Sequence, residues 1–399
     1  MSMLSVEEAR SRLLQEAVAL GGSEAVAVGD ALGRVLAEPL RSTISVPPAD
    51  NSEMDGYAVR CADIASAPTP LRVAQRIAAG QTGTDLLPGT AARIFTGAAI
   101  PAGADAVVMQ EMTEATGDRV IVKEVPRPGQ FVRRAGFDVA AGAIALDGGT
   151  LLRPQELGIA SAIGATQLRV RPRLRVALLS TGDELVMPGE PLPPGRIYNS
   201  SRFMFRALLQ GAGCIAEDLG IVPDRLDATR AALREAAARC DLIVTTGGVS
   251  VGEEDHVKEA IRREGAIDLW QVAMKPGKPL AFGRVGDVPV IGLPGNPVSS
   301  FVTYLLVARP FMRAQQGCRT TIIAARPMRA DFDWPRPNAR REFLRTRMGA
   351  SGGLEIFPDQ NAALISSLTW SDGLVDNPAG HPIHRGDTVA FLPFTELAA

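Results

Sequence analysis

The feature that most constrains the fold is a regular alternation of apolar runs and helical patterns in the second half of the chain. Four short apolar runs are typical of buried strands, and a helical segment follows each one. The runs are 174–179, 217–222, 242–246 and 289–293, and the helical segments are 201–210, 228–239, 255–264 and 297–306. This alternation predicts an α/β domain with a doubly wound, mostly parallel sheet that carries helices on both faces.

The remaining segments have different patterns. Ser5 and Glu8 form a capping-box pattern that predicts a helix to about residue 20, and a second short helix is expected over 30–38. Pro154 starts a helix through about residue 163, which we expect to pack on the first helices. Short β-prone runs fill 57–149 and the region after residue 320, where we predict a C-terminal β-barrel or sandwich. The predicted domains are a helical, elongated domain (1–44 and 139–172), a β-rich insertion (45–138), the α/β domain (173–318) and the C-terminal β-barrel (319–399).

Composition excludes several classes of function. The 399 residues contain 42 Lys and Arg against 44 Asp and Glu, so no basic excess favours nucleic-acid binding. The four cysteines are too widely spaced for a zinc motif, and a reducing compartment fits them best. The first 20 residues carry charges that a signal peptide lacks, and no apolar run reaches the roughly 20 residues that span a membrane. We therefore expect a cytoplasmic protein with no membrane partner.

Polar loops follow the predicted strands of the α/β domain. Ligands of open α/β sheets bind beyond the carboxyl ends of the strands. There the chain has 180–184, 223–224, 247–255 and 294–299. Gly247, Gly248 and Gly252 allow backbone amides to approach a phosphate at a helix start, and Ser250 adds a hydroxyl. The alternative is a plain strand-to-helix turn, and Asn296-Pro297 is by itself a structural helix start.

Charged residues surround these loops. Asp183, Glu184, Asp224 and Asp255 place acids near a predicted anion site, and acids beside phosphates indicate a bridging cation, for which oxygen ligands favour Mg²⁺. Some of these acids, Asp255 above all, are alternatively helix caps. The stretch 275–279 holds two lysines between prolines, which makes a stiff cationic loop that suits phosphate, or else a solvated surface turn.

The β-rich insertion adds three stretches, 51–58, 95–98 and 133–138, whose roles cannot be assigned singly. Taken together in their order, the motifs resemble those of the molybdenum insertases, the family of the bacterial molybdopterin molybdenumtransferases and the E domain of gephyrin. The matching stretches are 48–60, 96–98, 133–138, 180–185, 247–252, 275–279 and 293–299.

The resemblance implies a homodimer with a site between the α/β domain of one subunit and the β-rich domain of the other. It implies that molybdate and adenylylated molybdopterin give molybdenum cofactor and AMP with Mg²⁺, and that the chain contacts the molybdopterin adenylyltransferase of the pathway. The implied catalytic residues are Asp55, Glu184, Asp224, Asp255 and Lys275, with Glu184, Asp224 and Asp255 as Mg²⁺ ligands. The implied ligand-binding residues are Thr96, Arg133, Asp138, Thr181, Gly182, Asp183, Gly247, Gly248, Ser250, Gly252, Lys278, Pro294, Gly295, Asn296, Pro297 and Ser299. Arg340, Arg345, Ser366 and Ser367 match more loosely, and Gln271 stands where the family often has a lysine.

Two other classes of function stay open at this point. An adenylyltransferase or nucleotide amidohydrolase would share the α/β domain, but it would not need the motifs between Asp50 and Asp138. A scaffold protein without catalysis would be expected to have lost some of the acids at the site. The choice between molybdate and tungstate also stays open, because the two oxyanions have nearly the same size and charge.

Overall fold

The predicted α/β sheet is present in the computed structural model, which describes residues 3–248 and 256–398. Its six strands run in the order β16-β13-β17-β21-β20-β18. The first four are parallel, and β20 runs antiparallel to both of its neighbours, β21 and β18. The bounds are β16 Ile215–Val222, β13 Arg175–Thr181, β17 Leu242–Thr246, β21 Val288–Leu293, β20 Pro279–Val285 and β18 Gly265–Gln271. The mostly parallel sheet predicted from the alternation is thus confirmed.

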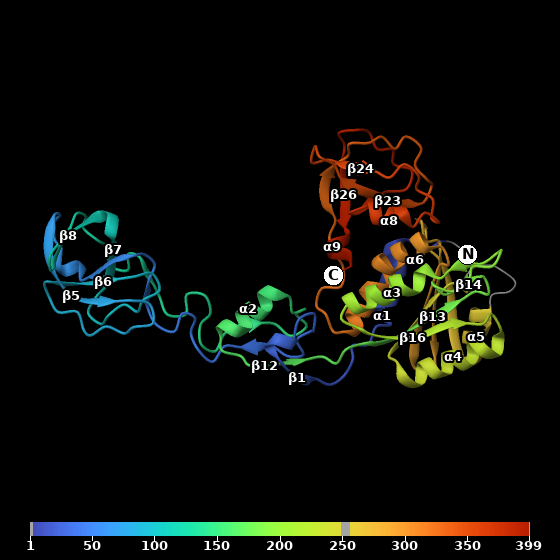
Figure 1. The fold of residues 1–399 in the computed structure, drawn as a ribbon, viewed down its shortest axis with the longest axis horizontal. Helices are drawn as coiled ribbons and strands as arrows, with labels where there is room; N and C mark the ends of the chain where they lie inside the picture. The colour runs from blue at the N-terminus through green and yellow to red at the C-terminus, as the bar shows by residue number, and fades with distance from the viewer. Residues whose placement is uncertain (1–2, 249–255, 399) are drawn as a thin grey trace.

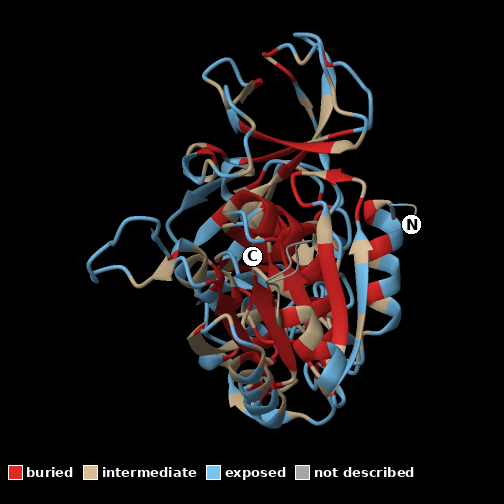
Figure 2. Ribbon diagram, turned by 90° about the vertical axis from the view of Figure 1, so that its right-hand side faces the viewer, coloured by how far each residue is buried: buried red, intermediate tan, exposed pale blue. Residues whose placement is uncertain are grey.

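Helices cover both faces of this sheet, and its strands are buried between them (Figure 2). On one face α4 (Leu226–Arg239) and α5 (His256–Glu264) share an apolar core with the strands. The other face is covered by α1 (Val6–Gln15), α3 (Ser200–Gly211), α6 (Pro297–Thr303) and α7 (Arg309–Gln315). A π-helical segment, η4 (Tyr304–Ala308), joins α6 to α7, so this helix continues beyond the predicted end at residue 306. The widened turn accommodates Pro310, which has no amide hydrogen to donate.

Helix α1 (Val6–Gln15) lies on the α/β domain and not on the domain expected from its position in the sequence. Its capping box is confirmed, because the Ser5 amide donates to Glu8 Oε2 at 2.7 Å and the Glu8 amide donates to Ser5 Oγ at 3.0 Å. The helix ends earlier than predicted. Val6, Ala9 and Leu13 form one buried stripe in the core, where α1 packs on η4 and α7. The prediction that α2 (Pro154–Ala162) packs on the first helices is therefore wrong for α1, although α2 does contact the 3-10 helix η1 (Val28–Asp30).

The middle of the molecule is a thin segment of paired short strands (Figure 1). It contains β1 (Glu24–Ala27) with β12 (Gln167–Val170), β2 (Leu40–Arg41) with β11 (Ile144–Leu146), and α2. The α-helix predicted over 30–38 is absent, and a 3-10 turn, η1 (Val28–Asp30), ends at the first residue of that range. Beyond it Val35 and Leu36 bridge to Leu151 and Val170, because burial between strands outweighs their helical spacing.

A six-stranded sheet forms the far end of the molecule (Figure 1). Its order is β7-β4-β6-β5-β9-β8, with apolar cores on both faces. The bounds are β4 Gly56–Val59, β5 Thr69–Ile77, β6 Thr90–Ile94, β7 Ala106–Met109, β8 Thr113–Thr116 and β9 Arg119–Val122, and β3 (Asn51–Ser52) pairs with β10 (Val132–Arg133) beside it. We call this end the β lobe.

The C-terminal sheet runs β19-β23-β25-β26-β22, with β24 also paired to β23. Its strands are β19 Met274–Lys275, β22 Arg326–Arg329, β23 Arg341–Met348, β24 Leu354–Ile356, β25 Gly373–Asn377 and β26 Thr388–Pro393. An isolated bridge between Ala330, which follows β22, and Leu354 links that edge of the sheet to β24. Short helices α8 (Ser366–Trp370) and α9 (Phe394–Leu397) accompany it. We call this sheet with its helices the C-terminal lobe. Because β19 belongs to the α/β segment of the chain, the α/β domain contributes one strand to the sheet of the C-terminal lobe.

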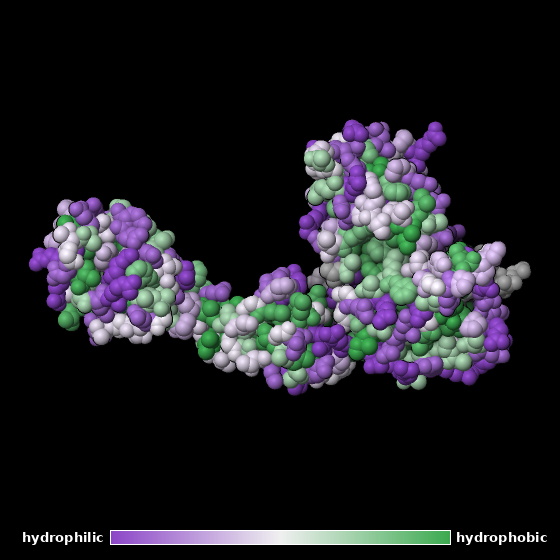
Figure 3. All heavy atoms as spheres, viewed as in Figure 1, coloured by the Kyte–Doolittle hydropathy of each residue, from purple (hydrophilic) through white to green (hydrophobic). Residues whose placement is uncertain are grey.

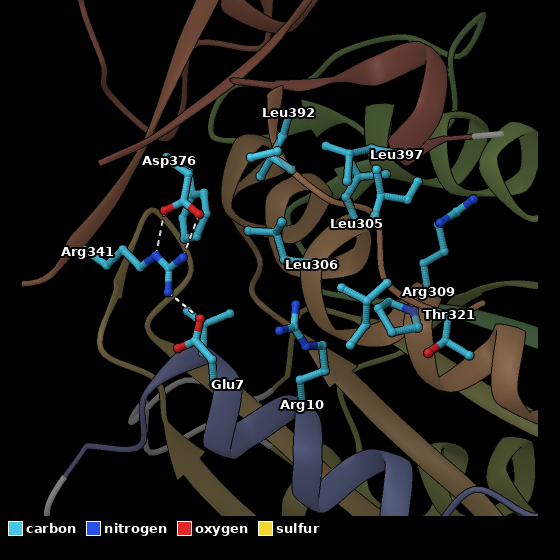
Figure 4. Close-up of a pocket in the computed structure, with 16 residues that line it drawn as sticks. Glu7, Arg10, Leu305, Leu306, Arg309, Thr321, Arg341, Asp376, Leu392 and Leu397 are labelled. Atoms are coloured by element: carbon cyan, nitrogen blue, oxygen red, sulfur yellow. Dashed lines mark hydrogen bonds and ion pairs between the residues drawn. The ribbon is translucent and has the colours of Figure 1, made fainter. Parts of the chain in front are cut away.

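A cavity of about 260 Å³ lies where α1, η4 and the C-terminal sheet meet (Figure 4). Its floor is apolar, with Leu305, Leu306 and Leu392. On one wall Arg341 bonds Asp376 with two nitrogens and also pairs with Glu7 of α1. The cavity contains none of the predicted site residues. Apolar side chains also gather on the surface where the C-terminal and α/β lobes meet (Figure 3).

Across residues 3–248 and 256–398, we find no helix with the length and apolar character needed to cross a lipid bilayer.

Candidate functional site

Three neighbouring strands of the α/β sheet end side by side and release the predicted glycine loops together. The strands β13, β17 and β21 end at Thr181, Thr246 and Leu293. The Gly247 amide donates to the Leu293 carbonyl at 3.2 Å. Buried hydroxyls of Ser180 and Thr246 lie 3.3 Å apart. We call this edge the rim, and it matches the position expected for a ligand of a parallel sheet.

Glycine is required at the rim by space as well as by backbone angle. Gly248 has φ +72°, and a Cβ there would lie 2.2 Å from Val257 Cγ2 and 3.0 Å from Thr181 Oγ1. Gly247 has φ +93° and faces the Thr181 carbonyl. Gly295 differs, since a Cβ there would meet only the Gly247 Cα, at 3.9 Å. The turns at Gly247 and Gly248 therefore leave no space for a side chain, whereas Gly295 lies exposed beside them.

Two loops that carry acidic residues meet at the same rim. The Asp224 amide, after β16, donates to Asp183 Oδ1, after β13, at 3.2 Å. Asp183 and Glu184 are exposed, and the Glu184 carboxylate lies over Gly182. In residues 3–248 and 256–398, no three His, Cys, Asp or Glu side chains form a group that could hold a metal ion. Ser250, Gly252 and Asp255 lie outside the described residues.

The cationic loop is held by the C-terminal lobe. Lys275 Nζ lies 3.3 Å from Glu342 Oε1, and the Glu342 side chain is 2% exposed against 38% for Lys275. The other carboxylate oxygen of Glu342 accepts from Trp334 Nε1 at 2.7 Å and from the Asn338 amide at 2.9 Å. Lys278 is exposed, and Gly277 packs against α6 at Thr303. Sequence reasoning missed Glu342, because its partner on β19 is distant in the sequence.

The loosely matched C-terminal residues divide into one near the rim and others that support the lobe. Arg340 donates to the Met274 carbonyl at 3.0 Å, next to Lys275. Arg345 is buried, bonds Ser367 Oγ at 3.3 Å and the Asn361 carbonyl at 3.2 Å, and burial lowers its pKa to about 10. Ser366 is exposed. Arg345 and Ser367 therefore hold a loop, and a direct ligand contact by them is not favoured.

That loop covers the start of α6. The Val298 amide donates to the Ala362 carbonyl at 3.2 Å, and Asn296 occupies the N-cap position without a side-chain cap. Pro294 and Ser299 are buried, and Pro297 fills the first turn. Asn296 and Gly295 are exposed beside the rim. The structural interpretation of Asn296-Pro297 as a helix start is thus confirmed.

The other predicted residues lie on the β lobe. Thr96 donates its amide and its hydroxyl to Asp55 Oδ1, both at 2.8 Å. These bonds, the amide bond first, lower the pKa of Asp55, so its carboxylate is ionised at neutral pH. Arg133 is half-buried on β10 and Asp138 is exposed. In one chain these residues lie at the opposite end of the molecule from the rim (Figure 1).

We expect Glu342→Leu to lower the free energy of unfolding by about 3 kcal/mol, because the Trp334 and Asn338 donors lose their buried acceptor. Urea unfolding measures this loss. Glu355→Leu is the matched control. The Glu355 side chain is 43% exposed, so its ion pair with Arg347 contributes only about 0.5 kcal/mol to the free energy of unfolding. Equal effects of the two substitutions would show that Glu342 does not anchor the lobe.

Comparisons with known proteins match the whole length of the chain. Family models match as the MoeA N-terminal region (domain I and II) over residues 4–164, a probable molybdopterin binding domain over 177–314, and the MoeA C-terminal region (domain IV) over 327–394. The crystal structure of the molybdopterin biosynthesis moeA protein from Pyrococcus horikoshii OT3 superposes with a TM-score of 0.83 and 28% identity, covering 98% of this chain and 99% of that one.

Curated relatives agree with this result. A molybdopterin molybdenumtransferase of Haemophilus influenzae is 41% identical over 317 residues, which are 79% of this chain and 78% of the relative. Molybdopterin molybdenumtransferase 2 of Mycobacterium tuberculosis is 37% identical over 390 residues, which are 94% of this chain and 96% of the relative. The resemblance carried by the rim and β-lobe motifs is thereby confirmed, and the chain belongs to the molybdopterin molybdenumtransferase family of transferase enzymes.

Proposed function

We propose that this chain inserts molybdate into adenylylated molybdopterin and releases AMP, as the last step of molybdenum cofactor biosynthesis. The family membership supports the general role in molybdenum cofactor biosynthesis. The specific reaction rests on the site, where a glycine cradle, acids and a lysine converge at one rim. We further propose that the protein works in the cytoplasm, contacts the adenylyltransferase that supplies its substrate, and has the four domains and C-terminal β-barrel predicted from its sequence.

One observation carries the proposal that the active form is a homodimer. Asp55, whose carboxylate accepts two hydrogen bonds from Thr96, lies on the β lobe, far from Glu184 and Lys275 on the rim (Figure 1). A thin segment separates them, and a single elongated chain leaves each group facing solvent. A second copy arranged by a two-fold axis would place the β lobe of one chain opposite the rim of the other, twice in each dimer.

Each part of the combined site has a chemical task. Backbone amides of Gly248 and Gly295 would hold the phosphate of the pterin substrate, while the Gly247 amide is used within the sheet edge. Lys275 on β19 and Arg340, which directly precedes β23 and donates to the Met274 carbonyl, would attract molybdate, which is a dianion. Asp55 and Glu184 would orient the phosphoanhydride and the groups that leave it. The pterin supplies sulfur ligands for the molybdenum, so the protein needs no cysteine at the rim.

A divalent cation fits this arrangement in part. Mg²⁺ commonly takes one or two carboxylates and completes its shell with substrate phosphates and water. Glu184 and Asp224 follow two adjacent strands at the rim and would hold it, together with Asp255 from the segment outside the described residues. When bound, Mg²⁺ supplies charge neutralisation to the phosphoanhydride. The carboxylates would in that case point toward the bound phosphate.

The direct test is AMP release by the purified protein from adenylylated molybdopterin and Mg²⁺, with and without molybdate. We expect AMP only when molybdate is present, and none with Glu184→Ala. If AMP never appears although the pterin binds, the chain is a carrier or a scaffold and the transferase proposal fails. AMP release without molybdate would instead indicate a nucleotide hydrolase.

A further inference from the structure

A stack of two arginines and one aromatic ring lies beside Asp55 on the β lobe. The guanidinium carbons of Arg76 and Arg93 each lie 4.5 Å from the centre of the Phe95 ring. Arg93 also lies 5.3 Å from the Tyr57 ring. Phe95 directly precedes Thr96, which holds the Asp55 carboxylate. The stack therefore belongs to the same corner of the lobe as the predicted site residues.

Strand pairing explains why these side chains meet. Arg93 on β6 lies opposite Arg76 on β5 and opposite Tyr57 on β4. Phe95 follows two residues after Arg93, so the two side chains leave the same face of the strand. Both flanking strands end or begin at the corner that carries Asp55. The sheet thus fixes the stack in register with the acid.

The two arginines differ in whether their N–H donors are already used by groups of the β lobe. Arg93 donates to the Gly56 carbonyl at 2.9 Å and to Gln110 Oε1 at 2.8 Å, so its fork is used within the lobe. Arg76 is exposed, and no carboxylate pairs with it in residues 3–248 or 256–398. Stacking on Phe95 orients the Arg76 guanidinium while its N–H groups face solvent. A planar fork held in this way suits two phosphate oxygens and loses little entropy on binding.

We propose that Arg76, oriented by Phe95, binds the diphosphate of the nucleotide-bearing substrate. This inference rests on the proposed function, because it assigns a substrate contact to the β lobe that faces the rim of the second copy. Arg76 would contact the phosphate oxygens on the side opposite the glycine cradle. The Asp55 carboxylate is held by Thr96 and lies near Arg93. Its negative charge would repel the phosphate oxygens and so limit how closely they approach this corner of the β lobe.

The test compares Arg76→Gln with Arg72→Gln in the full-length protein. Arg72 is an exposed arginine on the same strand and carries the same charge, but it has no aromatic ring beneath it among the described contacts. Inorganic pyrophosphate is the probe, measured by calorimetry at one ionic strength. We expect Arg76→Gln to weaken pyrophosphate binding about tenfold and Arg72→Gln to leave it unchanged. Arg76→Lys keeps the charge without the fork and should fall between them.

Several outcomes overturn the proposal. If Arg76→Gln binds pyrophosphate with wild-type affinity, Arg76 is not part of the site. If Arg72→Gln weakens pyrophosphate binding equally, the effect comes from the overall positive charge of the lobe and not from a specific contact. With adenylylated molybdopterin as substrate, Arg76→Gln should raise KM for the pterin about tenfold and leave KM for molybdate unchanged, which a purely structural role would not do. If the wild type binds pyrophosphate but releases no AMP, the proposed function fails while the comparison of the two arginines still decides the role of Arg76.

Discussion

Asp55→Asn is expected to lower the rate of AMP release by roughly 100-fold or more, while the protein stays folded. Asparagine keeps the shape and can still accept from the Thr96 amide and hydroxyl, which hold Asp55 Oδ1 at 2.8 Å. Only the negative charge is lost. Steady-state AMP release and thermal melting, measured on the same preparation, separate the two effects. A variant with wild-type activity would show that the carboxylate is structural.

Glu53→Gln is the matched control for this substitution. Glu53 lies two residues away in the same loop and is half-buried. It should change the rate of AMP release less than about twofold, because a charge outside the site contributes little.

The pH dependence of AMP release gives an independent check on Asp55. Because the Thr96 hydrogen bonds lower the pKa of Asp55, its charge is lost only as pH falls through that lowered value. Thr96→Val removes the hydroxyl donor and should raise the pKa of Asp55. The acidic limb of the pH–rate profile should therefore shift to higher pH in this variant.

Gly248→Ala should destabilise the α/β domain by roughly 2–4 kcal/mol and abolish AMP release. The methyl group would stand 2.2 Å from Val257 Cγ2, on a backbone with φ +72°. Helix α5 and the β17 loop would have to separate to admit it. Urea unfolding measures the loss, and a change below about 0.5 kcal/mol would contradict the packing described for the rim.

Gly295→Ala tests the role of the rim in phosphate binding without disturbing the packing of the rim. A methyl group at residue 295 meets only the Gly247 Cα at 3.9 Å, so the fold should be unaffected. The same methyl group would occupy the space where a phosphate approaches the backbone. We expect a loss of roughly 100-fold in kcat/KM with unchanged unfolding. Full activity in this variant would remove Gly295 from the cradle.

Much of the α/β domain is predictable from the sequence, because buried parallel strands are read as continuous apolar runs. β17 falls on the predicted residues 242–246, and the glycine loop follows it directly. The convergence of Gly247 and Gly295 follows from the rule that parallel strands share a carboxyl edge. These parts of the site depend on local pattern and one topological rule.

The parts that could not be predicted depend on contacts between distant segments. The stripe of Val6, Ala9 and Leu13 shows that α1 has one buried face, but an apolar stripe does not name its partner. Glu342 acquires its role only when β23 pairs with β19, 67 residues away. The stack of Arg76 on Phe95 likewise needs the register of β5 against β6. Residues 30–38 form no α-helix, because Val35 and Leu36 are instead buried in isolated bridges to Leu151 and Val170, which are distant in the sequence.

The most direct test of a site shared between two copies is complementation. Asp55→Ala and Glu184→Ala proteins, each inactive alone, are mixed, unfolded and refolded together, and AMP release is measured. In a mixed dimer one site takes its rim from the first chain and its β lobe from the second, and both are intact. With random pairing, half of the dimers have one intact site of two, so activity should return to about one quarter of the wild-type value. No recovery in a mixture that forms dimers would place Asp55 and Glu184 in sites within one chain and contradict the shared site.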